Sequence, residues 1–250
     1  MEKKFELTEK YVVNELGTKL YQIKCTKTFK YAKEGELGGY IEKEKNLSQE
    51  GDAWVSGNAW VSGDARVFGD ARVSGDAWVF GDARVYGDVR VSGDAQVSGD
   101  AWVYGDAWVS GDARVYGTAQ VSGNARVFGD ARVFGDAHVY GTAQVSGDAR
   151  VFGDAQVSGD AQVSGNACLK SDADHCGFDS FGSSNRHTHA YLTSDNTVEI
   201  TCGCFRGSIE EFEKKVKNTH SGTVYENQYN AIINVIKIKF GSVKRQNRQV

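Results

Sequence analysis

The 250-residue sequence contains no proline, although it contains thirty glycines. Proline cannot donate a backbone hydrogen bond and is excluded from the interior of continuous β-ladders. Its absence is therefore expected in a fold in which nearly every backbone N–H is engaged. No apolar run approaches the ~18 residues of a transmembrane helix, and the N-terminus leads into no signal-type hydrophobic core. These absences predict a chain that is neither inserted in a membrane nor exported.

Cysteines are few and the charge is nearly balanced. The five cysteines are irregularly spaced and odd in number, so they form no disulfide framework, and a reducing cytoplasm is the expected location. The net charge of −4 argues against a broadly basic nucleic-acid-binding protein. The acidity belongs to residues 51–170, which carry fifteen Asp against eight Arg and one Lys.

One six-residue unit, Gly-Asp-Ala-x-Val-(Ser/Phe/Tyr), recurs through the middle of the chain without insertion. Nineteen valines follow one another at this spacing from Val55 to Val163, and Leu169 takes the twentieth place. Ala and Val alternate with an outward residue, as in a short strand that is buried on one face. Gly with Asp, Asn or Thr then forms a corner, because Gly adopts the positive φ that a sharp bend needs.

Three such units close an 18-residue triangular coil, since the unbroken spacing leaves too little chain for strands to reverse into hairpins. Coils stack about 4.8 Å apart, so six to seven of them form a rod on the order of 30 Å long. Each buried Val contributes roughly 1.5–3 kcal/mol, and stability accumulates between neighbouring coils. Open coil ends expose ladder edges, so both ends need caps. The sequence therefore predicts a mainly β, three-sided parallel β-helix over residues 51–170.

The repeated Val-x-Gly-x-Ala-x pattern resembles the hexapeptide-repeat, left-handed β-helix proteins, and the handedness is implied by this resemblance. Residues 1–50 are expected to form an N-terminal β cap, with a hairpin around Asn14–Gly17. The string GELGGYIEKEKNLSQEGDAWVSGNA, which leads into the first coil, is similar to the entry segment of hexapeptide-repeat proteins of bacteria and their phages. Some of those proteins are labelled acyltransferases.

Residues 171–250 are predicted to form a small α+β module. Its expected elements are a β-hairpin, a first helix and a second helix, over His187–Thr193 with Thr197–Cys204, Ser208 to about His220, and about Thr223–Phe240. Gly241 is expected to stop the second helix. The segment TCGCFRGSIEEFEKKVKNTH resembles the C-terminal module of uncharacterised phage and prophage proteins, which implies a viral or mobile-element origin.

Outward residues form columns, because every third unit lies above the same side of the prism. One face carries Trp60, Trp78, Arg114, Arg132 and Arg150, beside Tyr116, Phe134 and Phe152. The next face carries Arg66, Arg84 and Trp102, beside Phe68, Tyr86 and Tyr104. The remaining face carries Trp54, Arg72, Arg90, Trp108 and Arg126, beside mostly Ser.

The first two of these faces are the predicted binding surface. Arginines on neighbouring rungs repel by about 1 kcal/mol per pair in water before screening. An Arg column beside an aromatic column can bind phosphates and stack bases, or form a hot spot for a protein partner. The alternative is that these residues pair with each other and with nearby Asp, and only stiffen the rod.

Corner carboxylates form acidic ladders, such as the one formed by Asp76, Asp94, Asp112, Asp130 and Asp148. We expect them to bond local backbone N–H groups at the bends. Rows of carboxylates can also attract Ca²⁺ or present a DNA-like line of charge to a nucleic-acid-binding protein.

The sequence predicts no catalytic site and no cofactor. Many members of the resembled family are acyltransferases, which implies a His general base near a groove between trimer subunits and acyl-CoA as substrate. The array extrudes no loop, and its single histidine, His138, fits an ordinary outward position. The weak candidates for a zinc site are His187, His189, Cys202 and Cys204, because neither pair has the longer ligand spacing of structural zinc sites.

The sequence thus favours a non-enzymatic, rigid scaffold, encoded by a phage or prophage, that binds or inhibits a host protein through its aromatic–Arg faces. Nucleic acid or a nucleotide is a second class of partner. An acyltransferase that uses acyl-CoA, and an acidic DNA mimic or Ca²⁺-binding solenoid, stay open as alternatives. The resembled family implies trimers, and exposed aromatic residues are equally consistent with a dimer.

Overall fold

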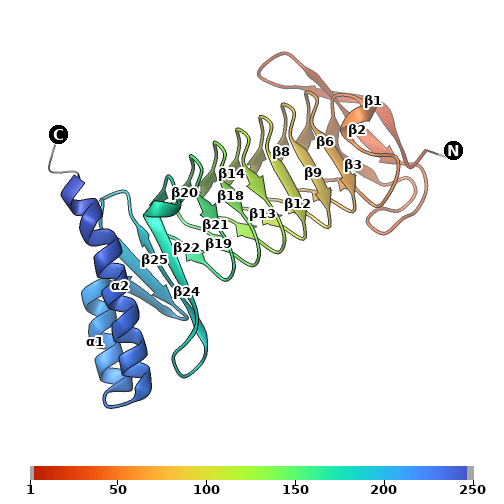
Figure 1. Ribbon diagram of the computed structural model, residues 1–250. Coiled ribbons are helices and arrows are strands. Elements are labelled where there is room, and N and C mark those ends of the chain that lie inside the picture. The colour runs from red at the N-terminus through yellow and green to blue at the C-terminus, as the bar shows by residue number, and fades with distance from the viewer. Residues whose placement is uncertain (1–2, 247–250) are drawn as a thin grey trace.

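The protein is a rod with a cap at each end (Figure 1). The structure is a computed structural model that describes residues 3–246, with side chains as far as residue 241. The N-terminal segment covers one end of the rod and the two helices lie at the other. Neither described helix combines the length and apolar character needed to cross a membrane.

The N-terminal cap is a small antiparallel sheet that merges with the solenoid. Its elements are β1 (Phe5–Val13), β2 (Lys19–Cys25), β3 (Leu37–Ile41) and the 3-10 helix η1 (Glu44–Asn46). β1 and β2 form the predicted hairpin, and β2 pairs antiparallel with β3. β3 pairs in parallel with the first solenoid strand on its side, and Leu47 bridges Val67. Parallel stacking therefore begins within the segment predicted as cap.

The solenoid consists of three columns of short parallel strands, here called the first, second and third faces. The first face contains β5 (Trp60–Val61), β8 (Trp78–Val79), β11 (Gln96–Val97), β14 (Arg114–Val115), β17 (Arg132–Val133), β20 (Arg150–Val151) and β23 (Cys168–Leu169). The second contains β6 (Arg66–Gly69), β9 (Arg84–Gly87), β12 (Trp102–Gly105), β15 (Gln120–Val121), β18 (His138–Val139) and β21 (Gln156–Val157). The third contains β4 (Trp54–Val55), β7 (Arg72–Val73), β10 (Arg90–Val91), β13 (Trp108–Val109), β16 (Arg126–Val127), β19 (Gln144–Val145) and β22 (Gln162–Val163).

Each solenoid strand pairs with the strand one coil further on, in register at 18-residue separation, as Arg114 with Arg132 and Val115 with Val133. The inward Ala and Val side chains are buried in one continuous core that runs from the N-terminal cap to Tyr191 of the C-terminal module. The prediction of a three-sided parallel β-solenoid is confirmed.

The corners depend on glycine because the backbone there is left-handed and the coils are close. Gly117, for example, has φ +71°, and an added Cβ would lie 3.0 Å from the backbone nitrogen of Gly135 in the next coil. A non-glycine residue in this backbone region costs on the order of 1–3 kcal/mol. The close approach adds a steric cost, since the neighbouring backbone belongs to a continuous ladder.

The corner carboxylates do not behave as predicted. Backbone N–H groups of Asp70, Asp76 and Asp82 already donate to glycine carbonyls of the next coil, at 2.9–3.0 Å. Few amides are therefore left for local Asp side chains, and the expected local bonds are wrong for most of these residues. Among residues 3–241, the Asp70 carboxylate accepts the N–H of Asp52 from one coil away at 3.2 Å.

Side chains of the N-terminal cap replace the missing preceding coil. The carbonyls of Ala53, Ala59 and Ala65 are among those of the first coil that face that end. The Lys4 ammonium donates to the first at 2.9 Å, the Tyr40 N–H to the second at 2.9 Å, and the Asn46 amide to the third at 2.9 Å. Lys4 is buried, and burial lowers its pKa to about 8. The carbonyls of these three alanines, which no preceding coil can pair, are thus satisfied by the cap.

The C-terminal module is a four-stranded antiparallel sheet with two helices on one face. Its elements are η2 (Asp172–Asp174), β24 (His175–Phe181), β25 (Arg186–Leu192), β26 (Val198–Cys202), β27 (Phe205–Ser208), α1 (Ile209–His220) and α2 (Val224–Gln246). The predicted hairpin and first helix are present, and Ser208 with Glu211 forms the capping box. The predicted stop at Gly241 is wrong, because Gly241 keeps a helical conformation and α2 continues through it.

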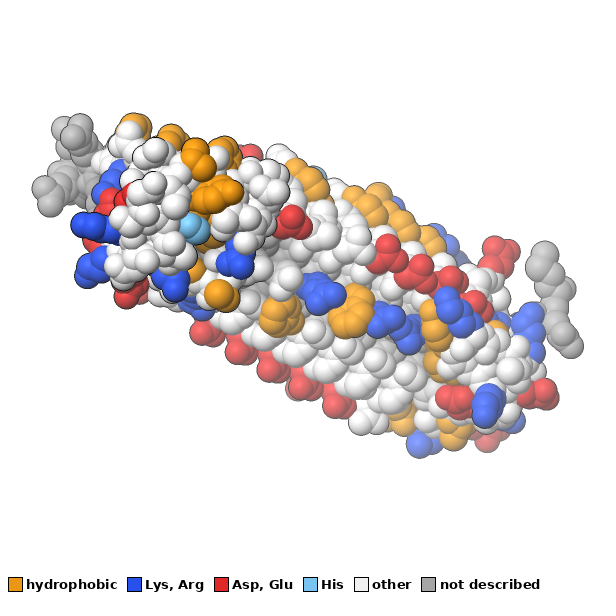
Figure 2. Space-filling model, turned by 90° about the horizontal axis from the view of Figure 1, so that it is seen from below, with side chains coloured by type: hydrophobic (Ala, Val, Ile, Leu, Met, Phe, Trp, Pro, Cys, Tyr) orange, Lys and Arg blue, Asp and Glu red, His pale blue; other side chains and the backbone are white. Residues whose placement is uncertain are grey.

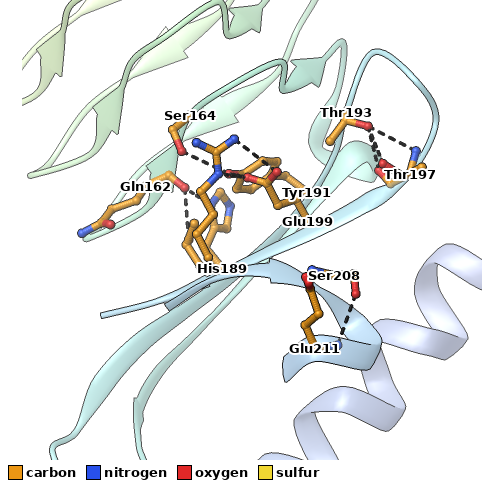
Figure 3. Close-up of polar contacts among 11 residues, drawn as sticks. Gln162, Ser164, His189, Tyr191, Thr193, Thr197, Glu199, Ser208 and Glu211 are labelled. Atoms are coloured by element: carbon orange, nitrogen blue, oxygen red, sulfur yellow. Dashed lines mark hydrogen bonds and ion pairs between the residues drawn. The ribbon is translucent and has the colours of Figure 1, made fainter. Parts of the chain in front are cut away.

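The sheet of this module closes the other end of the rod (Figure 3). Tyr191 is fully buried against the last coil, and its hydroxyl donates to Glu199 at 2.6 Å and lies 3.3 Å from Ser164 Oγ. The Thr201 hydroxyl donates to the Gln162 carbonyl at 3.2 Å. An aromatic plug and side-chain donors therefore take the place of a further coil.

The two costs at a corner glycine can be separated by a matched pair of substitutions. Gly159 has φ +61°, but an added Cβ there meets no atom within 4 Å. We expect Gly159→Ala to lower the free energy of unfolding by about 1 kcal/mol through backbone strain, and Gly117→Ala by about 2–3 kcal/mol. Chemical denaturation of both variants measures this. If both variants lost the same free energy of unfolding, the close approach of neighbouring coils at Gly117 would add no steric cost.

Candidate functional site

The first face carries a basic column beside an aromatic column, as predicted from the 18-residue alignment. Arg114, Arg132 and Arg150 occupy consecutive rungs and are exposed. Beside them the rings of Tyr116, Phe134 and Phe152 stack, with centroids 4.9 Å apart in each pair and interplanar angles of 1° and 5°. Nearer the N-terminal cap, the rings of Trp60 and Trp78 stack at 4.8 Å.

The second face repeats this arrangement nearer the N-terminal cap. Phe68, Tyr86 and Tyr104 form a continuous stack, with centroids 4.8 and 5.3 Å apart. In the neighbouring column the Arg84 guanidinium lies 4.9 Å from the ring centroid of Trp102. The same column begins with Arg66, in register with Arg84. The structure thus aligns the predicted residues of both faces within their columns.

Stacking determines what the rings can offer a partner. A ring inside a stack has both faces covered by its neighbours, so it presents only its edge to solvent. The edge of an aromatic ring carries the positive end of its quadrupole, and the face the negative end. Base stacking on the inner rings, which was one of the predicted uses, therefore has no free ring face. The columns offer electropositive edges next to guanidinium groups.

The solenoid arginines are not neutralised by the acidic ladders. Within the described residues 3–241, ion pairs of the solenoid carboxylates go to lysines of the N-terminal cap: Lys30 with Asp70 and Asp88 at 3.8 and 3.9 Å, and Lys43 with Asp64 at 2.8 Å. Four of the arginines, Arg72, Arg84, Arg90 and Arg126, lie over aromatic rings instead. Figure 2 shows rows of acidic side chains along the rod, with a row of basic and hydrophobic side chains between them.

The third face holds an aromatic–Arg column that the sequence prediction did not select. The Arg72 guanidinium lies 4.6 Å from the ring centroid of Tyr31, a residue of the N-terminal cap. Arg90, on the next rung, lies 4.5 Å from the Trp108 ring, and Arg126 lies 5.2 Å from the same ring. The alignment of the array could have revealed these arginines, whereas Tyr31 comes from outside the repeat.

A groove runs along each side of this column. One, of about 570 Å³, is lined by Lys30, Tyr31, Arg72, Asp88, Arg90, Asp106, Trp108, Asn124 and Arg126. The other, of about 420 Å³, is lined by Tyr31, Trp54, Ser56, Arg72, Ser74, Arg90, Ser92 and Trp108. Trp54 was expected to point outward, but the cap covers it: it is 2% exposed and packs edge-on against Phe29.

The weak zinc candidates of the C-terminal module do not converge. Thr188 pairs with Cys202 across the sheet, and the Cys202 sulfur lies 3.8 Å from the Tyr229 hydroxyl on the helix side. His189 points the opposite way, toward the solenoid. Cys204 is exposed in the following turn, and His187 bonds Asp179 at 2.5 Å. Among residues 3–241 no three His, Cys, Asp or Glu side chains are grouped as a metal site requires.

His189 is a structural residue of the end closure. Its Nδ1 lies 3.5 Å from the Gln162 carbonyl, which can only accept, so Nδ1 carries the proton. Its Nε2 lies 3.0 Å from His175 Nδ1 and accepts from it. Burial, with the neighbouring imidazoles, lowers the pKa of His189 to about 3, and burial also lowers the pKa of His175. The pair is therefore neutral in the folded protein at pH 7.

The geometry defines a β-solenoid repeat protein with side-chain caps. Six segments of the solenoid match the sequence model of a family described as the YdcK beta solenoid repeat, at residues 65–81, 83–99, 95–111, 119–133, 125–141 and 143–159. All six lie within the coils, and neither cap is matched. A comparison with curated proteins gives no match.

The buried His189 predicts a loss of stability in mild acid. The unfolded imidazole titrates near 6.5, and the folded one near 3. The neutral His189 imidazole therefore contributes fully to the free energy of unfolding above pH 6.5. This contribution is lost progressively as pH falls toward 3, by on the order of 2 kcal/mol at pH 5. In chemical denaturation between pH 8 and pH 5, His189→Gln should lose less stability than the wild type.

The same substitution at His138, on the outer second face, controls for the removal of one imidazole. If His138→Gln flattened the pH dependence as much as His189→Gln, the assignment to the buried ring would be wrong.

Proposed function

We propose that the protein is a non-enzymatic scaffold whose first face binds a macromolecular partner. The observation that carries the proposal is the column of Arg114, Arg132 and Arg150, three exposed guanidinium groups on consecutive rungs. Two adjacent charges at this separation repel by on the order of 1 kcal/mol in water. The column is therefore a cost to the isolated rod, which contact with an acidic surface would offset.

The surroundings of the column favour a protein partner. Arginine and aromatic residues are the side chains that most often dominate binding energy at protein interfaces. Here they lie on a backbone fixed by ladders on both sides, so little backbone entropy is lost on binding. The covered ring faces weigh against single-stranded nucleic acid, which depends on stacking of its bases.

The origin of the partner follows from the resemblance of both flanking segments to phage and prophage proteins. We propose a protein of the bacterial host, with inhibition as one consequence of its capture. A complex isolated from that host and weighed by native mass spectrometry would give both the partner and the number of copies of this chain, including a dimer or trimer.

The proposal predicts that replacing the three arginines with serine abolishes partner capture. The three arginines point outward, and their replacement leaves the buried Ala and Val of each rung unchanged, so the R114S/R132S/R150S variant should fold and stack normally. Capture from bacterial lysate, followed by quantitative mass spectrometry, should fall by about tenfold or more, because each charged contact contributes roughly 1.5–3 kcal/mol. Melting temperature verifies the fold.

The matched control replaces three outward glutamines of the other two faces, Gln120, Gln144 and Gln156, with serine, and should retain the partner. Unchanged capture by the arginine variant would discard the first face as the binding surface. Saturable heat on titration with acetyl-CoA would instead favour an acyltransferase, and competition by DNA for the captured protein would favour a DNA mimic.

A further inference from the structure

Two of the eight solenoid arginines stand beside serine, whereas the other six stand beside an aromatic ring. The two are Arg72, followed at two residues by Ser74, and Arg90, followed by Ser92. Residues two apart in a strand point to the same side, so each Arg shares the outer surface with its Ser. Arg72 and Arg90 are also in register on adjacent rungs. The four side chains line one groove, and all four can donate hydrogen bonds.

Small serines leave space where the other rungs carry rings, and this space is the groove of about 420 Å³. Its lining contains two guanidinium groups and the hydroxyls of Ser56, Ser74 and Ser92, and no carboxylate. The groove of about 570 Å³ on the other side of the column contains Asp88 and Asp106, which would repel an anion. The serine side is therefore the side on which an anion would bind.

Both guanidinium groups are held by rings, so that their donors stay available. Arg72 lies against Tyr31 and Arg90 against Trp108, at 4.6 and 4.5 Å from the ring centroids. Stacking uses the flat face of a guanidinium and leaves its in-plane N–H groups for an oxyanion. Tyr31 is positioned by the cap loop, where Phe29 packs edge-on against Trp54 with centroids 5.5 Å apart.

Two of the carboxylates on the other side of the column, those of Asp70 and Asp88, pair with a lysine of the cap. Lys30, the residue before Tyr31, lies 3.8 Å from the Asp70 carboxylate and 3.9 Å from that of Asp88. On the serine side, Arg72 and Arg90 therefore lie on adjacent rungs with no carboxylate in the lining of their groove. A bound anion would supply the negative charge.

We propose that this groove binds a doubly charged phosphate group, inorganic or as a monoester, between Tyr31 and Trp108. A phosphate dianion matches the two positive charges, and its oxygens can accept from both guanidinium forks and from the hydroxyls of Ser74 and Ser92. A carboxylate neutralises only one of the two arginines. The site lies on the third face and does not depend on the proposed function of the first face.

Calorimetric titration of the full chain at pH 7.5 and low salt tests the proposal, with inorganic phosphate, phenyl phosphate and acetate as probes. Both phosphates should bind saturably and acetate about tenfold more weakly or not at all. Tighter binding of phenyl phosphate than of phosphate would assign the site to a monoester, whose organic part contacts the aromatic walls. Equal affinity would assign it to inorganic phosphate.

The R72Q/R90Q variant should lose phosphate binding by about tenfold or more. The matched control is Arg84→Gln, because Arg84 also stacks on a tryptophan, 4.9 Å from the Trp102 ring centroid, but stands beside Tyr86 instead of serine. It should bind phosphate like the wild type. An equal loss in this control would mean that only overall charge matters and would overturn the proposal.

A second variant separates the site from the fold. S74F/S92F places rings beside both arginines, as the array does at its six other arginines, so the rungs should stack and the melting temperature should not fall. The rings fill the groove, and phosphate binding should be lost. Wild-type affinity in this folded variant, or no preference of the wild type for phosphate over acetate, would show that the groove is not a phosphate site.

Discussion

Parallel pairing between residues 18 positions apart is the constraint on which the other features of this structure depend. Each rung receives its hydrogen bonds from the coil on either side, so the register cannot slip without moving every side chain of that rung. The same register buries an Ala and a Val at each inward place and aligns each outward side chain with its counterparts. Ring stacks, arginine columns and acidic ladders are consequences of this one repeat distance.

A ladder with this regularity leaves unpaired groups only at its ends, and there the repeat is replaced by individual side chains. At the N-terminal end the Lys4 ammonium and the Asn46 amide donate to open carbonyls. At the other end Tyr191, Thr201 and His189 contact the last coil. Ionisable groups are costly in such places, as the lowered pKa of Lys4 indicates. The burial of these groups is nevertheless favourable for the protein, because unpaired ladder edges at the coil ends would pair with strands of other molecules.

Most of the solenoid could be predicted because a single period determines its fold and its columns. Prediction failed where contacts cross between the repeat and its flanks. Tyr31 belongs to a cap loop with no periodicity, so its contact with Arg72 was invisible in the sequence. The opposite orientations of His189 and Cys202 depend on which face of a small sheet meets the solenoid. The corner carboxylates were misjudged because their amides are used by the next coil.

The groove on the third face is built from the N-terminal cap and the coils that end at Trp108, and the inward residues of the coils beyond are nearly identical to one another. Whole coils could therefore be gained or lost between Trp108 and the C-terminal module without altering that groove or either end closure. Recombination between such similar repeats in a gene would change only the separation of the two caps, in steps of one coil spacing. The architecture thus lets the length of the rod evolve independently of the site at one end.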